Sequence, residues 1–352
     1  MLDLGTRALA DRLRQLAQFF AQPGHGGSDA TVAVPLSVGA FDHVLQLDQV
    51  HLPDRTGCRL SGPHHGHLIS MGTEKRAVVN PERTDAADEL VDRVEVDTEQ
   101  PDDPSEIAER AADAAVDPAV DVVAAVGGDG TQRTVAEAIA GSDTELAIVP
   151  GGTVNLLGRV HGIESVEDAA DAIERGEAHP FDLARCDGHA YLLNSSSGLD
   201  AAMIAAVDDR AKRFGRAGYT AMGLLELIRA KPSHVSVVVD GETVFDDDAL
   251  TVMVLNVGER GSASFRIAPD AATDDGLLDV VVITGSRRSY LRAGWSRFRK
   301  RLPADADARF TQGREIEVRW AGEVAVQCDG DPVEPRSTIR YTVEPGAVAI
   351  RS

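Results

Sequence analysis

The sequence of 352 residues predicts an α/β fold in which a doubly wound parallel-sheet domain is followed by a second, antiparallel β-sandwich domain. Two observations predict it. Between residues 75 and 185, short apolar segments alternate with segments of helical periodicity, which is typical of a parallel sheet covered by helices. After residue 186, segments of alternating apolar and polar residues follow one another and are joined by turn residues, which is typical of antiparallel strands.

The first of these domains is expected to contain four strands and three helices. The segment 121–126, DVVAAV, is short and fully apolar, as in strands buried within a parallel sheet. The segment 104–116 opens on proline and serine and then has apolar residues at helical spacing. The predicted strands are 76–80, 93–98, 121–126 and 145–149, and the predicted helices are 84–91, 104–116 and 131–140.

The second domain is expected to consist mainly of strands. These are 191–196, 234–245, 249–258, 277–284, 314–320 and 323–333, and helices are expected at 217–230 and 287–302. The apolar GAVAIRS at the chain end is expected to return to the first domain as an edge strand.

Residues 1–70 hold six of the ten histidines and weakly periodic, Gly/Pro-rich sequence. We therefore divide the chain into a poorly ordered extension (1–74), a nucleotide-binding domain (75–185), a β-sandwich (186–340) and a returning strand (341–352).

Composition restricts the classes of function. The formal net charge is −22 and only four of the 35 basic residues are lysine, which favours a halophilic origin and disfavours nucleic-acid binding. An acidic protein from a high-GC mesophile is the alternative. Three widely spaced cysteines indicate no disulfide framework. No segment approaches the roughly 20 apolar residues of a membrane span, and no signal peptide is recognisable, so a cytoplasmic location is expected.

Two glycine-rich segments follow neighbouring predicted strands, GGDGT at 127–131 and PGGTVN at 150–155. Ligands of open parallel sheets bind at the carboxyl ends of the strands, and a helix that starts there attracts phosphate. Ordinary strand-to-helix turns use glycine for steric reasons alone, but two such loops side by side favour a phosphate site. An aspartate would repel phosphate, so Asp129 is expected to act through Mg²⁺ or a nucleotide hydroxyl. The P-loop, GxGxxG, HExxH and GxSxG motifs are absent.

These loops resemble the catalytic domain shared by diacylglycerol kinases, sphingosine kinases and their bacterial lipid-kinase relatives, whose nucleotide domain is NAD kinase-like. GGDGT alone is also found in NAD kinases and phosphofructokinases. Further segments resemble this family in the same order along about residues 76–351, and they make the resemblance specific. They are Asn80-Pro81, NSSSGLDA (194–201), AKRFGRAGY (211–219), APDAATDDGLLDVVVI (268–283) and CDGD (328–331).

The resemblance implies ATP-dependent phosphoryl transfer to a lipid hydroxyl, in which Asp331 is the general base and Asp129 is also catalytic. The cofactors implied are ATP and Mg²⁺. The residues implied to bind the nucleotide are Asn80, Thr98, Gly127, Gly128, Asp129, Gly130, Thr131, Gln132, Arg133, Gly152, Thr153 and Asn155. Ala272, Asp275 and Leu277 match the family's structural magnesium site. Asp-Asp-Gly is equally a hairpin turn, and both interpretations of Asp275 stay open.

Four positions depart from the family pattern. Thr134 replaces a glutamate after GGDGT, and Leu156 replaces the aspartate of GTxND. NPERT at 80–84 replaces the glycine-rich NPxSG opening, and Asp331 replaces a glutamate whose side chain is one methylene longer. A carboxylate is retained at the base position, so activity remains expected. The first two changes could alter nucleotide or magnesium handling.

The segment RRSYLRAGWSRFRKRL at 287–302 has seven positive charges and no acidic residue. Leu291, Trp295, Phe298 and Leu302 share one helical face, so the segment could contact a membrane surface as a peripheral anchor. The alternative, packing of this face on the sandwich, is slightly favoured.

Two other functions stay open. They are NAD kinase activity, and non-catalytic nucleotide or lipid binding in a divergent member. The sequence does not indicate the oligomeric state.

Overall fold

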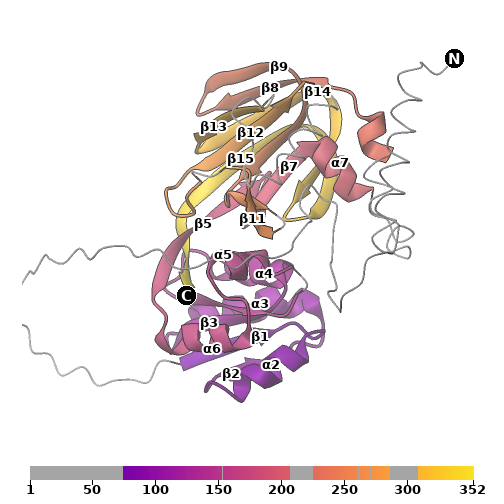
Figure 1. Ribbon diagram of the computed structural model, residues 1–352. Coiled ribbons are helices and arrows are strands. Elements are labelled where there is room, and N and C mark those ends of the chain that lie inside the picture. The colour runs from indigo at the N-terminus through magenta and orange to yellow at the C-terminus, as the bar shows by residue number, and fades with distance from the viewer. Residues whose placement is uncertain (1–73, 153, 207–224, 261, 269–270, 286–307) are drawn as a thin grey trace, which may run out of the picture. The chain divides into compact units, whose positions relative to one another are not determined.

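Four parallel strands form the sheet of the first half, in the order β2-β1-β3-β4 (Figure 1). In the computed structural model, the described residues are 74–152, 154–206, 225–260, 262–268, 271–285 and 308–352. All of them belong to one compact unit of the chain. The strands are β1 (Glu74–Val79), β2 (Asp97–Glu99), β3 (Val120–Gly127) and β4 (Glu145–Pro150).

Helices cover both faces of this sheet. Helix α2 packs beside α6, and α3 packs beside α4, and Figure 1 shows these two pairs on opposite sides of the strands. The doubly wound architecture predicted from the sequence is therefore confirmed. The helical elements are α2 (Thr84–Val91), η1 (Pro104–Glu106), α3 (Ile107–Val116), α4 (Asp129–Ile139), α5 (Leu156–Val160) and α6 (Val166–Arg175).

The predicted strand at 93–98 is wrong in its position, because β2 covers Asp97–Glu99. The end of α2 uses the first residues of the predicted strand. The backbone N–H groups of Arg93 and Val94 donate to the carbonyl of Leu90 at 2.9 and 3.0 Å. Val94 is buried against the core by this turn. Its apolar character therefore comes from packing under the helix end and not from a sheet position.

The second half is the predicted antiparallel β-sandwich. β9 and β14 are each 14 residues long and belong to both layers, since each pairs with β8 along its first half and with β7 along its second. The elements are β5 (Ala178–Cys186), β6 (His189–Tyr191), β7 (Asn194–Gly198), α7 (Leu199–Ala205), β8 (Ser233–Val239), β9 (Glu242–Leu255), β10 (Glu259–Arg260), β11 (Ser262–Arg266), β12 (Leu278–Thr284), β13 (Ala308–Gly313), β14 (Glu315–Cys328) and β15 (Asp331–Arg351).

Several predicted strand boundaries in this half are wrong. The segment 191–196 is split between β6 and β7, since the N–H groups of Leu192 and Leu193 donate to a carboxylate. The segment 234–245 is a hairpin that turns at Asp240-Gly241, where both residues have positive φ. The segments 314–320 and 323–333 form one strand, β14, followed by a hairpin turn.

Strand β15 runs from this hairpin to the chain end as 21 continuous residues. It pairs with β14 and β5 in antiparallel fashion, and its last residues, Ala349–Arg351, pair in parallel with Glu145–Ala147 of β4. The domain boundary proposed at residue 340 therefore falls inside a strand. One hydrogen-bonded path of strands consequently extends from β13 to β2.

Within the described part of the chain, the core contains three apolar clusters. One lies between the parallel sheet and its helices, a second between the layers of the sandwich, and a third beneath α7. Among the described residues, no helix has the length and hydrophobicity needed to cross a bilayer. Residues 225–229 are helical within the predicted helix 217–230. The extension 1–73 and the basic segment 287–302 lie outside the described residues.

Candidate active site

The two glycine-rich loops contact each other directly at the carboxyl ends of β3 and β4. The N–H of Gly151 donates to the carbonyl oxygen of Gly127 at 2.9 Å. A Cβ atom placed on Gly152 would lie 2.7 Å from the Cα of Gly128, and one placed on Gly128 would lie 3.3 Å from the Cα of Gly152. Glycine is therefore required here because two backbones approach closely. The steric interpretation and the phosphate interpretation of these loops are thus compatible.

The end of β1 joins the same loops through Asn80. Its Nδ2 donates to the hydroxyl of Thr131 at 2.9 Å, and its Oδ1 accepts the N–H of Glu82 at 3.0 Å. The buried Thr131 hydroxyl occupies the space where a side chain on Gly127 would lie. Three adjacent strand ends are therefore fixed to one another before any ligand binds.

Asp129 begins helix α4 and links it to helix α5. Its carboxylate accepts the N–H of Leu157 at 3.1 Å. Partial burial raises the pKa of Asp129, and the hydrogen bonds from the N–H groups of Leu157 and Leu156 and the charge of Arg159 oppose this rise. A carboxylate that is half-buried and incompletely compensated is suited to bind a cation or a hydroxyl group.

Asn155 closes the second loop on itself. Its backbone is in the left-handed region with φ of 49°, and its side chain accepts from the N–H of Gly152 at 2.8 Å and donates to that residue's carbonyl at 2.9 Å. Asparagine tolerates this conformation better than most residues. Thr153 lies outside the described residues. Leu156, at the position where the family pattern has aspartate, is buried.

The first turns of α4 carry two further residues of the predicted site, Gln132 and Arg133, and Thr134, which departs from the family pattern. Gln132 is fully buried and donates from Nε2 to the carbonyl of Gly127 at 3.2 Å, while its Oε1 has no hydrogen-bond partner among the described residues. Thr134 donates its hydroxyl to the carbonyl of Gly130 within the helix at 3.0 Å. Arg133 instead reaches the sandwich, where its guanidinium donates to the carboxylate of Asp331 at 3.0 Å.

Asp331 follows a tight turn made by Asp329 and Gly330, both with positive φ. The turn is held by the carboxylate of Asp329, which accepts three backbone N–H groups at 2.8 to 3.0 Å. The donors are Leu192, Leu193 and Asn194. Burial raises the pKa of Asp329 to about 6, although these hydrogen bonds and the charge of Arg133 oppose the rise. Asp329 therefore positions the predicted base, a role that sequence reasoning missed.

A buried polar network lies behind this turn, on β7 and β14. Gln327 donates from Nε2 to Asn194 at 3.1 Å and to Ser196 at 2.9 Å, and its Oε1 accepts the N–H of Gly330 at 2.7 Å. Ser196 in turn donates to Asp200 at 2.5 Å. The polar run NSSSG, which forms the whole of the largely buried strand β7, was the available signal, because buried polar side chains need partners. Its partners could not be read locally, since Gln327 is more than 130 residues away in sequence.

The predicted magnesium site lies in the turn before β12. The carboxylate of Asp275 is exposed and accepts the N–H of Leu277 at 2.9 Å, and Ala272 lies in the same turn. Asp182, which is fully buried, accepts the N–H groups of Gly276 and Gly346 at 2.7 Å each. Burial and the charges of Asp275 and its neighbour Asp274 raise the pKa of Asp182. Residues 272–277 have the geometry of a turn, and the carboxylates of Asp274 and Asp275 give this turn a negative charge that would attract a cation. Among the described residues, no three carboxylate, imidazole or thiol groups form a metal-binding cluster.

Thr98 is not brought to the glycine-rich loops by any recorded contact. It lies on edge strand β2 opposite Ala77 and lines a cavity of about 400 Å³ beside α2. The other lining residues are Val79, Thr84, Ala87, Asp88, Val91, Asp92 and Gln100. The predicted contact of Thr98 with a nucleotide would require the ligand to extend into this cavity.

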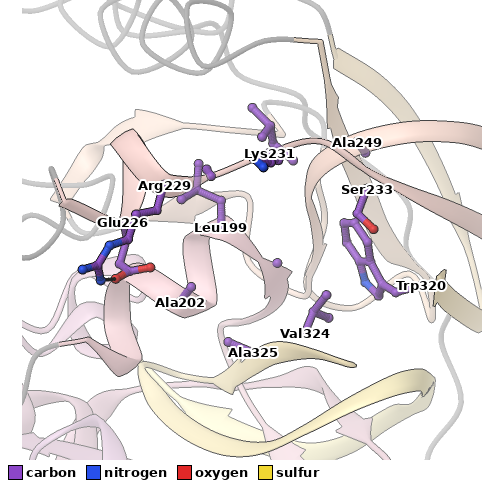
Figure 2. A pocket seen from close by; sticks show the side chains of 13 residues that line it. Leu199, Ala202, Glu226, Arg229, Lys231, Ser233, Ala249, Trp320, Val324 and Ala325 are labelled. Atoms are coloured by element: carbon purple, nitrogen blue, oxygen red, sulfur yellow. Dashed lines mark hydrogen bonds and ion pairs between the residues drawn. The ribbon is translucent and has the colours of Figure 1, made fainter. Parts of the chain in front are cut away.

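A second cavity, of about 240 Å³, opens in the sandwich (Figure 2). Figure 2 shows Leu199 and Ala202 of α7 on one side of it and Trp320 of β14 on the other. The indole N–H of Trp320 donates to Ser197 at 3.1 Å, which fixes the ring as one wall. Arg229, paired with Glu226 at 3.3 Å, and Lys231 also line this cavity. It thus combines apolar walls with basic groups.

Comparisons with known proteins cover both halves. The family model of the diacylglycerol kinase catalytic domain matches residues 72–186, and that of the YegS C-terminal NAD kinase beta sandwich-like domain matches residues 194–352. A probable YegS-like lipid kinase of Pseudomonas aeruginosa is 31% identical over 237 residues, which are 64% of this chain and 74% of that protein.

Two further relatives are similar at lower identity. A diacylglycerol kinase of Bacillus subtilis is 25% identical over 217 residues, which are 60% of this chain and 71% of that protein. A crystal structure of a diacylglycerol kinase from Bacillus anthracis has a TM-score of 0.60 and 20% identity, and it covers 79% of this chain and 96% of that chain. This last likeness establishes the fold alone.

Proposed function

Because the chain belongs to the lipid-kinase family that contains the YegS-like kinases and diacylglycerol kinases, we propose that it transfers the γ-phosphate of ATP to a lipid hydroxyl. The observation that carries the proposal is the ion pair between Arg133 and Asp331. It brings a carboxylate of the sandwich against the first turns of the helix that begins in GGDGT. A base and a phosphate loop on opposite sides of one site are what phosphoryl transfer to a hydroxyl requires.

In the proposed reaction, Asp331 accepts the proton of the lipid hydroxyl while the oxygen attacks the γ-phosphorus. The new O–P bond forms as the bond from that phosphorus to the β,γ-bridging oxygen breaks, and ADP leaves. The amides of the two glycine-rich loops bind and orient the phosphates. Asp129 offers a carboxylate that would hold Mg²⁺, which would supply neutralisation of phosphate charge, whereas the turn containing Asp275 would hold a structural Mg²⁺.

In this proposal the lipid body occupies the cavity between α7 and β14. Val324 and Ala325 line that cavity, and the same strand ends at Cys328, which pairs with Asp331. Three residues of a strand span about 10 Å, so an apolar group in the cavity could continue to a hydroxyl at Asp331. The helical pattern of the basic segment 287–302 by itself slightly favours packing on the sandwich, but a substrate that resides in a bilayer leads us to propose that the segment contacts the inner membrane surface.

The test is incubation of the protein with γ-labelled ATP, Mg²⁺ and a total lipid extract, at high salt because the net charge is −22. Label in the organic phase supports the proposal. Label on added NAD would instead indicate an NAD kinase. Nucleotide binding without transfer to either acceptor would indicate a non-catalytic binding protein.

The variant Asp331→Asn tests the base and is expected to lower kcat by about 10²-fold or more, as loss of general-base catalysis does. Asp187→Asn is the matched control. Asp187 also lies at a hairpin turn of the sandwich with positive φ, and it pairs with Arg336 at 2.7 Å. Its variant is expected to retain activity. Equal activity of both variants would refute Asp331 as the base.

A further inference from the structure

Arg133 and Asp331 are 198 residues apart in sequence. Among the described residues, Arg133 is the polar partner of the Asp331 carboxylate. The Asp331 side chain is 66% exposed, whereas that of Arg133 is 22% exposed. The arginine is therefore the more fixed partner. An exposed aspartate without such a partner would exchange between rotamers, because little packing restrains it.

The backbone around Arg133 is rigid. It lies in helix α4, directly after Gln132, whose buried amide is bonded to the carbonyl of Gly127. The backbone from which the arginine side chain extends is thus held against the GGDGT loop. A side chain fixed at this point can set the distance between the loop and any group that it holds.

The contact between the two side chains uses one nitrogen of the guanidinium and Oδ2 of the carboxylate. Oδ1 of Asp331 has no recorded hydrogen bond within the described part of the chain. The pair therefore orients the carboxylate while leaving one oxygen able to accept a proton. A bidentate pair would have occupied both oxygens.

We infer that Arg133 is a positioning residue, which holds the Asp331 carboxylate at a fixed place opposite the GGDGT loop. The inference rests on the proposed function, in which Asp331 is the base. It differs from the prediction that Arg133 only lines the nucleotide. Positioning requires that loss of Arg133 lowers kcat, because misplacement of a reacting group by about 1 Å can cost up to about 100-fold in rate.

The experiment compares Arg133→Met, Arg133→Lys and Asp331→Asn in the full chain, with kcat and the KM for ATP measured separately. Arg133→Met is expected to lower kcat about tenfold with an unchanged KM for ATP, which is the signature of an interaction needed in the transition state. Arg133→Lys, which can still donate to Oδ2, is expected to recover most of this loss. In the double variant with Asp331→Asn, loss of Arg133 is expected to have no further effect, because the two residues act as a unit.

Arg185→Met is the matched control. Arg185 also joins helix α4 to strand β15, through Glu137 at 2.8 Å and through Glu344. Its loss removes the ion pairs by which β5 links these two elements, without touching Asp331, so kcat is expected to be unchanged. A similar fall of kcat in Arg185→Met would show a merely structural effect and would overturn the inference.

Two other outcomes would also overturn it, and they are distinguishable from each other. If Asp331→Asn is inactive but Arg133→Met has normal kcat, or only a raised KM for ATP, then Arg133 does not position the base and the proposed function stands. If Asp331→Asn is fully active, the assignment of the base fails and the inference fails with it. Thermal denaturation of each variant identifies any loss of folding, and Arg133→Ala, which also removes the donor to Oδ2, provides the decisive kcat if Arg133→Met does not fold.

Discussion

The carboxylate of Asp129 accepts a hydrogen bond from the backbone N–H of Leu157, with 3.1 Å between the oxygen and the nitrogen. This bond joins the helix that begins in GGDGT to the helix that follows PGGTVN. The aspartate that a phosphate would repel therefore holds the two loops in their relative position. Whether its charge is also needed for activity can be tested separately from this structural role.

Asp129→Ala is expected to lower the free energy of unfolding by about 1 kcal/mol, as loss of an acceptor at a helix start does. Asp129→Asn retains an acceptor oxygen and is expected to recover most of that stability but not the kinase activity, because a neutral amide binds a cation weakly. Urea denaturation and the lipid-phosphorylation assay measure the two effects. Full activity of Asp129→Asn would show that the carboxylate charge is dispensable.

Gly152→Ala is expected to destabilise the protein by about 1–3 kcal/mol, the usual cost of overpacking. Its Cβ would lie 2.7 Å from the Cα of Gly128, so the two loops would have to separate. Gly130→Ala is the control for stability, since a Cβ there meets no atom within 4 Å and the residue is helical. It is expected to stabilise the helix by about 0.5–1 kcal/mol. Equal denaturation midpoints for the two variants would contradict the close contact.

Asp329 gives the folded protein a characteristic pH dependence. Its pKa is raised from 3.8 to about 6, so the folded state binds the proton more tightly than the unfolded state between these values. The contribution of this group to stability is therefore greatest below pH 4 and falls as the pH rises through about 6. The variant Asp329→Asn keeps a residue suited to positive φ before glycine and does not titrate.

The difference in stability between the native protein and Asp329→Asn is expected to change in favour of the variant as the pH rises from about 4 to 7. Denaturant midpoints measured at several pH values and constant salt give this difference. Subtracting the free energy of unfolding of the variant from that of the native protein cancels the contributions of the other carboxylates. A difference independent of pH would mean that Asp329 titrates normally.

The turn at 272–277 is expected to bind Mg²⁺ and to stabilise the protein when it does. Addition of Mg²⁺ at constant ionic strength should raise the thermal midpoint, and Asp275→Ala should reduce this rise. Asp274→Ala is the matched control, because it removes a neighbouring exposed acid that is not a predicted ligand. An equal rise in Asp275→Ala would leave Asp275 with the role of a turn residue, bonded to the N–H of Leu277.

The sequence predicted the architecture and the loops well because their signals are local. Apolar strands followed by glycine at 127 and 151 indicate strand ends, and Asp-Gly pairs such as 240–241 and 329–330 occur at positive-φ turns. These patterns depend on neighbours in the chain. The two Asp-Gly turns were nevertheless missed, because the predicted strands 234–245 and 323–333 ran through them. The position of β2 was wrong for the converse reason, since Val94 is apolar because of contacts beneath α2.

The parts of the site that sequence reasoning missed depend on partners distant in the chain. The carboxylate of Asp329 holds residues 192–194, and Asp182 holds Gly276 and Gly346. No periodicity reports such pairs, because both partners only look like turn or strand residues in their own segments. The exposed Asp331 was found through resemblance to a motif, while the arginine that contacts it was assigned only to the nucleotide.

The length of strand β15 determines the position of the predicted base, Asp331, relative to the glycine-rich loops. Asp331 is its first residue, its last residues pair with β4, and the carboxylate of Asp182 holds the N–H of Gly346 between them. Each residue of a strand adds about 3.3 Å and reverses the side-chain direction. A one-residue insertion or deletion between 332 and 345 would therefore either displace Asp331 from the loops or break the pairing with β4. Length variation should consequently be excluded from this strand, although it is tolerated in surface loops.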